Sequence, residues 1–252
     1  ERVVCVSDTV RDYVLEHYPS TDQAKLRVIP RGIDPAAFPP APWPDRVARA
    51  GVAVQDPRLG GDGPLLLLPG RGTRLKGHAD ALALLARLRG DGLDARLWMP
   101  GARDPARADY VAELESQAAA LGIADALAIT PPTAAIANAY AASDLVLQLS
   151  RKPEAFGRTV IEALSVGRPV LGWAHGGVGE LLRELQPDGA VAAFDEAALH
   201  SVARVLLDAV AARHDALQAT MPALVARYSL QAMQQSTLAI YQELANDPSD
   251  RR

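Results

Sequence analysis

Residues 153–180, PEAFGRTVIEALSVGRPVLGWAHGGVGE, are the most informative stretch of the sequence. Two carboxylates, Glu154 and Glu162, stand eight positions apart in it. Glu154 precedes a turn at Phe156-Gly157, whereas Glu162 falls inside a short apolar helix that the pattern predicts over 158–166. This arrangement can direct two hydrogen-bond acceptors at the hydroxyls of one ligand, with a helix N-terminus between them for an anion.

Short apolar runs alternate with helical patterns over most of the chain. The runs predict strands at Val3–Ser7, Leu26–Pro30, Leu65–Pro69, Ala95–Pro100, Ala126–Thr130, Leu145–Ser150 and Pro169–Trp173. Helices are predicted at Thr9–His17, Gly77–Arg89, Ala106–Leu121, Ala134–Ala142, Arg158–Val166 and Val178–Leu185. Near-continuous apolar strands that alternate with helices are typical of a parallel sheet covered on both faces. The fold class is therefore α/β: a Rossmann-like parallel sheet flanked by helices, with a C-terminal helical tail, whose ligands bind beyond the carboxyl ends of the strands.

Composition divides the chain into four parts. Residues 1–33 form a β-α-β piece, and the Pro- and Gly-rich residues 34–64 are interpreted as a linker with one short helix within Pro44–Ala50. Residues 65–228 form the main α/β body, and residues 229–252 a last helix and tail. The helix is expected over Leu230–Ala245 with Ser229 as its N-cap, and 247–252 are expected to fray.

The overall composition excludes several classes of protein. The net charge of −4, from 26 basic and 30 acidic residues, argues against a broad nucleic-acid surface. Cys5 is the only cysteine, which excludes an internal disulfide and a thiolate metal cluster. No apolar run approaches the roughly 18 residues of a membrane span. Because the chain opens at Glu1 without an initiator Met, we expect a fragment whose beginning lies upstream.

A glycine-bearing loop, GRGTRLKG at residues 70–77, follows the predicted strand at 65–69. Leu75 stands where a Walker A loop or a dinucleotide fingerprint requires glycine, so neither motif is present. The loop nevertheless places Arg71, Arg74 and Lys76 near a helix N-terminus, where guanidinium and ammonium groups can bind phosphate. From the residues alone, a solvated basic turn is an equally good interpretation.

Other candidate groups have simpler interpretations beside the functional one. Glu162 could be exposed and paired with Arg158, which would contribute only about 0.3–0.5 kcal/mol. The run after the strand at 169–173, with His175, Gly176-Gly177 and Glu180, permits close backbone approach to a ligand or forms a turn before the next helix. The Thr130–Thr133 segment, with Pro131, could be a proline-stiffened helix start.

Together, the two glutamates, the basic loop and the Gly-Gly turn closely resemble retaining glycosyltransferases of family 4, which have the GT-B fold. The resemblance covers nearly the whole chain and places it as the C-terminal, donor-binding half of such an enzyme, without the N-terminal Rossmann-like domain that supplies the acceptor site. It implies a nucleotide-sugar site with three catalytic residues, Arg71, Lys76 and Glu154.

The resemblance also implies a role for each site residue. Arg71 and Lys76 hold the donor diphosphate, Glu154 binds hydroxyls of the sugar, and Glu162 binds the ribose. The N–H groups of Phe156 and Gly157 face the sugar and those of Arg158 and Thr159 face a phosphate. The junction at Pro131 and Thr133 lies against the base; because Thr133 is neutral, uracil is favoured over guanine.

The predicted function is transfer of a hexosyl group from a UDP-sugar to a glycan or glycolipid acceptor, as in polysaccharide or lipopolysaccharide assembly. No metal or other cofactor is expected, because fixed cations replace the metal. The expected setting is cytoplasmic, with any peripheral membrane contact made by the missing half, and this fragment alone is expected to bind nucleotide without transferring sugar. The rival interpretations are a related sugar-nucleotide epimerase or phosphorylase, a non-catalytic nucleotide-binding module, and an α/β domain with no ligand here.

Overall fold

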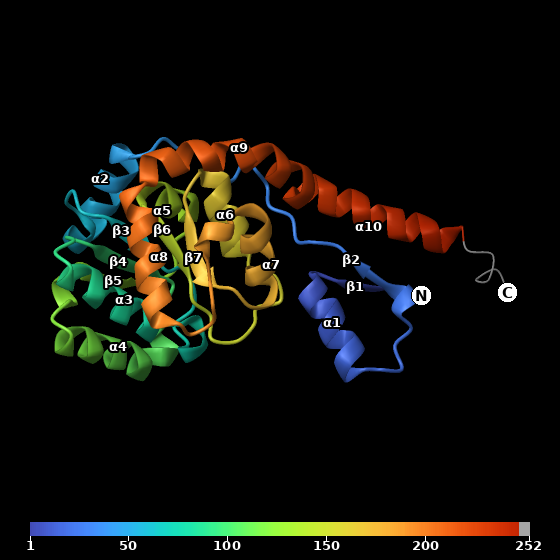
Figure 1. Cartoon of the computed structure of the whole chain (residues 1–252), viewed down its shortest axis with the longest axis horizontal. Helices are drawn as coiled ribbons and strands as arrows, with labels where there is room; N and C mark the ends of the chain where they lie inside the picture. Colours follow the sequence, from blue (N-terminus) through green and yellow to red (C-terminus); the bar gives the residue numbers. More distant parts are fainter. Residues whose placement is uncertain (247–252) are drawn as a thin grey trace.

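The computed structural model describes residues 1–246, apart from the side chains of residues 210 and 211. The fraying expected for 247–252 therefore lies outside the described residues. The described residues form two sheets, one of two strands near the N-terminus and one of six strands in the main body (Figure 1).

The six-stranded sheet is parallel throughout and has the order β5-β4-β3-β6-β7-β8. Its strands are β3 (Leu65–Leu67), β4 (Arg96–Pro100), β5 (Leu127–Thr130), β6 (Leu145–Gln148), β7 (Val170–Trp173) and β8 (Ala190–Val191). The central β3 is buried on both faces, and Leu66 is in register with Leu97 on one side and Leu145 on the other. The predicted fold class is confirmed, although β8 was missed because two residues carry no periodicity.

Helices cover both faces of this sheet and divide the core in two. One face packs against α2 (Arg46–Gln55), α5 (Ile136–Ala142), α6 (Arg158–Val166), α7 (Gly176–Leu185) and α9 (Val210–Tyr228). The other packs against α3 (His78–Gly90), α4 (Ala108–Ala120) and α8 (Glu196–Asp208). The helices therefore bury the near-continuous apolar strands from both sides.

The N-terminal residues form a small unit of their own, made of β1 (Val3–Cys5), α1 (Asp8–His17) and β2 (Leu26–Val28). Figure 1 shows this unit beside the main body, with α10 (Leu230–Ala245) running along it. A bridge between Ile33 and Ser229 joins the two segments, and Glu243 on α10 pairs with Arg27 at 3.2 Å. The predicted bounds of α10 and its N-cap are confirmed, since the Ser229 hydroxyl accepts a hydrogen bond from Ala232 N at 3.0 Å.

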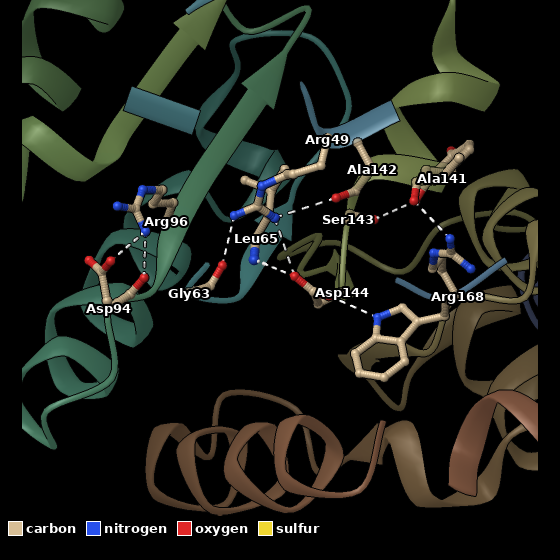
Figure 2. A network of polar contacts seen from close by, with 12 residues as sticks. Arg49, Gly63, Leu65, Asp94, Arg96, Ala141, Ala142, Ser143, Asp144 and Arg168 are labelled. Atoms are coloured by element: carbon tan, nitrogen blue, oxygen red, sulfur yellow. Dashed lines mark hydrogen bonds and ion pairs between the residues drawn. The ribbon is translucent and has the colours of Figure 1, made fainter. Parts of the chain in front are cut away.

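Residues 34–64 hold more regular structure than expected, because α2 continues to Gln55, five residues beyond the helix predicted within Pro44–Ala50. Asp45 caps α2 by accepting from Ala48 N at 2.9 Å. The Asp144 carboxylate, at the amino end of β6, accepts from Leu65 N at 2.7 Å and from Arg49 on α2 at 3.3 Å (Figure 2). This network attaches the segment to the amino edge of the sheet, opposite the site described below.

The neighbouring strands β3 and β6 mark the point at which the chain changes faces. The chain leaves β3 for α3 on one face and leaves β6 for α6 on the other. The loops beyond their carboxyl ends, residues 68–77 and 149–157, meet through a hydrogen bond from Arg151 N to Leu75 O at 2.8 Å. A crevice at such a switch point is the usual ligand site of an open α/β sheet.

Candidate functional site

The loop after β3 carries Lys76 to the switch point. It ends in a 3₁₀ turn, Arg74–Lys76, followed by Gly77 in the left-handed conformation at φ 73°. A Cβ on Gly77 would lie 2.0 Å from the carbonyl oxygen of Leu149. Glycine at this position is what lets the two loops come within contact distance, because any side chain would separate them.

Lys76 and Glu154 form the centre of the candidate site, although they are 78 residues apart in sequence. Lys76 Nζ lies 2.5 Å from Glu154 Oε1, which also accepts from the Ser150 hydroxyl at 2.5 Å. Burial raises the pKa of Glu154, but hydrogen bonds from Lys76 and Ser150 and the positive charge of Lys76 outweigh burial and lower it. Glu154 is therefore an ionised acceptor at neutral pH and cannot serve as a proton donor there.

The Gly-Gly turn at the start of α7 supports the Glu154 loop. Gly177 N donates to Glu154 O at 2.8 Å, and a Cβ on Gly176 would lie 2.8 Å from the same oxygen. The close backbone approach that these glycines permit is thus made to residues 153–156 of the protein itself. His175 adds to this contact, because its Nε2 lies 2.8 Å from Ser150 O.

Helix α6 starts beside this loop without a side-chain cap. Its N-cap is Gly157 in the left-handed conformation at φ 98°, and a Cβ there would lie 2.7 Å from Val178 Cγ2 on α7. The first-turn N–H groups, at Arg158 and Thr159, have no partner within the helix, as at every helix start. Together with the helix dipole they provide a place for a phosphate oxygen.

Glu162 lies one turn into α6 and is buried, with only 8% of its surface exposed. Its Oε2 accepts from the Tyr140 hydroxyl at 2.9 Å, and Oε1 pairs with Arg158 at 2.7 Å. The simpler interpretation, an exposed Glu162 paired with Arg158, is therefore right about the pairing. It is wrong about the exposure, because residues 160–166 are buried on all sides of the helix. Glu162 is thus a fixed acceptor in a low-dielectric setting rather than a surface charge.

Removal of the Tyr140 hydroxyl should weaken this arrangement measurably. Tyr140 is buried on α5, and burial together with the Glu162 charge raises its pKa well above the usual value, so it remains a donor. The Tyr140→Phe substitution leaves one Glu162 oxygen without that donor and is expected to cost about 1–3 kcal/mol of unfolding free energy. Chemical denaturation measures the loss; Phe38→Leu, a change in the neighbouring ring without a hydroxyl, serves as the packing control.

Three other predicted residues stand apart from the Lys76–Glu154 pair. Arg71 is exposed and has no ion pair among residues 1–246, so its guanidinium is available to a ligand. Pro131 is exposed at the end of β5, where its carbonyl accepts from Gly101 N at 3.2 Å. The Thr133 hydroxyl accepts from Ala135 N at 3.1 Å and so opens the turn before α5.

Arg74, a third candidate phosphate-binding residue of the loop to which the family resemblance gave no role, turns outward. It pairs with Glu113 on α4 at 2.5 Å and lies 5.1 Å from the centre of the Tyr110 ring. The side chains of Arg74 and Glu113 are both exposed, so this ion pair resembles an ordinary surface contact. The basic loop is therefore divided, with Lys76 directed to Glu154 and Arg74 away from it.

The sequence did not indicate what Glu180 binds. Its carboxylate accepts from Thr9 N at 2.5 Å, from Asp8 N at 3.1 Å and from the Thr9 hydroxyl, all at the start of α1. Ser7 makes a parallel contact by donating to Ala155 O at 2.6 Å. Glu180 on α7 thus caps a helix of the N-terminal unit. Because the two residues are 171 positions apart, no local sequence pattern predicts this contact.

In the part of the chain from 1 to 246, no group of three His, Cys, Asp or Glu side chains is placed to hold a metal ion. Across those same residues, no helix has both the length and the apolar character needed to cross a membrane.

The comparisons with known proteins agree in the family that they indicate. The family model for glycosyl transferases group 1 matches residues 53–220. A D-inositol 3-phosphate glycosyltransferase of Geodermatophilus obscurus is 33% identical over 248 residues, 91% of this chain and 52% of its own length. A protein of the same name from Kineococcus radiotolerans is 29% identical over 278 residues, 100% of this chain and 59% of its own length. The chain thus spans a little over half the length of these curated relatives.

Solved structures share the fold at low sequence identity. A glycosyltransferase from Rickettsia africae superposes with a TM-score of 0.86 at 24% identity, over 98% of this chain and 64% of its own. HepE of Anabaena, solved with UDP and glucose, superposes with a TM-score of 0.82 at 20% identity, over 97% of this chain and 63% of its own. Both likenesses extend over nearly all of this chain.

Proposed function

The chain belongs to the group 1 glycosyl transferases, and we propose that it is the donor-binding half of a retaining, family 4 enzyme that uses a UDP-sugar. The observation that carries the proposal is the 2.5 Å contact between Lys76 Nζ and Glu154 Oε1 at the β3/β6 switch point. A cation for a diphosphate and a carboxylate for sugar hydroxyls lie side by side there, next to the uncapped start of α6.

Binding of the donor would exchange partners within this pair. The diphosphate competes with Glu154 for the Lys76 ammonium, and the released carboxylate accepts hydrogen bonds from the sugar hydroxyls. Arg71 and the N–H groups of Arg158 and Thr159 complete the phosphate site, and the N–H groups of Phe156 and Gly157 face the sugar. Glu162, held by Tyr140 at 2.9 Å, takes the ribose hydroxyls, and the base rests on Pro131 and Thr133.

Catalysis then follows from fixed charge. As the bond between sugar and phosphate breaks, negative charge accumulates on the leaving diphosphate, where Lys76, Arg71 and the α6 N-terminus stabilise it. No metal is required, because these positive groups supply the neutralisation. The lowered pKa of Glu154 fits a positioning role and argues against general acid catalysis. Retention would follow a front-face route, in which the leaving phosphate helps to deprotonate the acceptor.

The complete reaction requires residues beyond this chain. We propose that a preceding domain binds a glycan or glycolipid acceptor, makes any peripheral contact with the cytoplasmic face of a membrane, and completes the catalytic cleft. Solved structures with the same fold include WaaG, described as a glycosyltransferase involved in lipopolysaccharide biosynthesis, at 21% identity and a TM-score of 0.74. That setting is compatible with this chain, which by itself would bind donor without transferring sugar.

Titration calorimetry with UDP, GDP and ADP, each with and without EDTA, tests the proposal. We expect UDP to bind, EDTA to leave its affinity unchanged, and GDP and ADP to bind at least about tenfold more weakly, a difference of about 1.4 kcal/mol. The Glu162→Ala substitution should weaken UDP binding through loss of the ribose contact. Binding of UDP only in the presence of a divalent metal would contradict the metal-independent mechanism, and equal binding of the three nucleotides would contradict the choice of base.

A further inference from the structure

A second ion pair, between Asp80 and Arg151, joins the two loops beside the candidate site. The Arg151 guanidinium engages Asp80 with both prongs of its fork: Nε donates to Oδ2 at 2.9 Å and Nη2 donates to Oδ1. The Asp80 side chain, in the first turn of α3, is only 2% exposed, whereas that of Arg151 is 46% exposed. A two-pronged bond to a buried carboxylate is far more directional than an ordinary surface pair.

The pair lies next to Lys76 and Glu154 along both chain segments. Arg151 follows Ser150, which donates to Glu154 at 2.5 Å, and Arg151 N donates to Leu75 O, the residue before Lys76. One residue of the β6–α6 loop thus binds the β3–α3 loop through its backbone and α3 through its side chain. Both bonds restrict the separation of the segments that carry Lys76 and Glu154.

The outer side of Arg151 is also supported. Its guanidinium lies 5.4 Å from the centre of the Phe194 ring, which in turn packs edge-on against His175 at 5.7 Å. His175 in turn contacts the β6–α6 loop, since its Nε2 lies 2.8 Å from Ser150 O. The half-exposed guanidinium of Arg151 therefore lies between Asp80 and Phe194 and has a partner on each side.

We propose that the Asp80–Arg151 pair is a positioning clamp that holds Lys76 within hydrogen-bonding distance of Glu154, and so presets the diphosphate and sugar subsites. The proposal rests on the function proposed above. Neither Asp80 nor Arg151 is assigned contact with the donor; both act through the geometry of the neighbouring pair. The clamp joins the site loops to each other, so its loss should affect the site more than the core.

A double-substitution cycle tests the clamp through donor affinity. Asp80→Asn and Arg151→Gln are each expected to weaken UDP-sugar binding by about tenfold, and the double variant to bind no more weakly than either single one, because both remove the same contact. Arg151→Lys should bind UDP-sugar little better than Arg151→Gln, since an ammonium group cannot form the two parallel hydrogen bonds that a guanidinium makes with a carboxylate. Arg89→Gln is the matched control: it removes an arginine at the other end of α3 that pairs with Asp94 at 3.2 Å. Additive losses in the double variant would overturn the clamp.

The ionisation of Glu154 provides a test that needs no ligand. With carbon-13-labelled glutamate, and Glu154→Gln to assign its signal, the pKa of Glu154 is measured by NMR in the wild type and in Asp80→Asn. If the clamp holds Lys76 near, its loss weakens the hydrogen bond and the charge interaction with Lys76 that lower the pKa of Glu154, and the pKa rises. If the clamp has no positioning role, removing the negative charge of Asp80 lowers that pKa or leaves it unchanged, which overturns the proposal.

The two tests separate failure of the clamp from failure of the proposed function. If the wild-type chain binds no UDP-sugar, alone or as part of the complete protein, the proposed function is wrong. The pKa of Glu154 still tests the clamp in that case, because its measurement needs no ligand. Thermal unfolding of each variant is measured beside both tests. A rise in the pKa of Glu154 in an Asp80→Asn variant that melts as the Arg89→Gln control does supports positioning, a result that a purely structural role would not produce.

Discussion

Replacing Lys76 with alanine is expected to lower the affinity for UDP-sugar by about 10- to 100-fold, since a hydrogen bond between charged groups contributes about 1.5–3 kcal/mol. Two effects act in the same direction. The substitution removes the cation proposed to bind the diphosphate, and it leaves Glu154, which is only 26% exposed at its side chain, as an uncompensated negative charge in the site. Calorimetric titration of both proteins with UDP-sugar measures the difference.

The same reasoning predicts partial recovery in a second variant. Adding Glu154→Gln to Lys76→Ala removes the repulsive charge, so the double variant should bind UDP more tightly than Lys76→Ala alone. Lys152→Ala is the control, because Lys152 is an exposed lysine of the β6–α6 loop, two residues before Glu154, and has no ion pair in the described part of the chain. Unchanged affinity in Lys76→Ala would contradict the proposed diphosphate site. An equal loss of affinity in Lys152→Ala would show that the loss comes from the change in net charge and not from a specific contact.

Replacing Arg168 with alanine is expected to cost about 3–5 kcal/mol of unfolding free energy. Arg168 has no exposed surface, and it donates to Ala141 O at 2.7 Å and to Pro42 O at 2.6 Å. Figure 2 shows the Arg168 guanidinium turned toward the carbonyl of Ala141, on α5. Alanine would leave a cavity and leave both carbonyls without this donor.

Methionine at position 168 separates the two contributions. Burial lowers the pKa of Arg168, which reflects a real cost of keeping this charge away from water. Arg168→Met keeps most of the volume and removes that cost, so its loss of stability should be smaller than that of Arg168→Ala. Chemical denaturation of both variants, with the exposed Arg107→Ala as control, measures the difference. An Arg168→Ala protein within about 1 kcal/mol of the wild type would contradict the prediction.

Local patterns predicted the regular elements well where they were long or sharply bounded. The limits of α6 at Arg158–Val166 and of α10 at Leu230–Ala245 are those the sequence indicated, because Gly167 ends the first and Ser229 caps the second. The extent of α2 was underestimated, since the many prolines around it suggested an irregular linker. The candidate site was predicted partly from residues and partly from resemblance: physics alone left the basic loop undecided between a phosphate site and a solvated turn.

Apolar periodicity is a local property, so the alternation of strands and helices, and with it a parallel sheet covered on both faces, could be predicted from the amino-acid sequence. Which residues meet could not be predicted in this way, because it depends on how the elements are arranged in space. The adjacency of β3 and β6 brings Lys76 to Glu154 and Arg151 to Asp80, packing on all sides buries Glu162, and Glu180 caps a helix of the N-terminal unit. These contacts depend on strand order and on which face each helix covers, and the interactions that set both act between residues far apart in the chain.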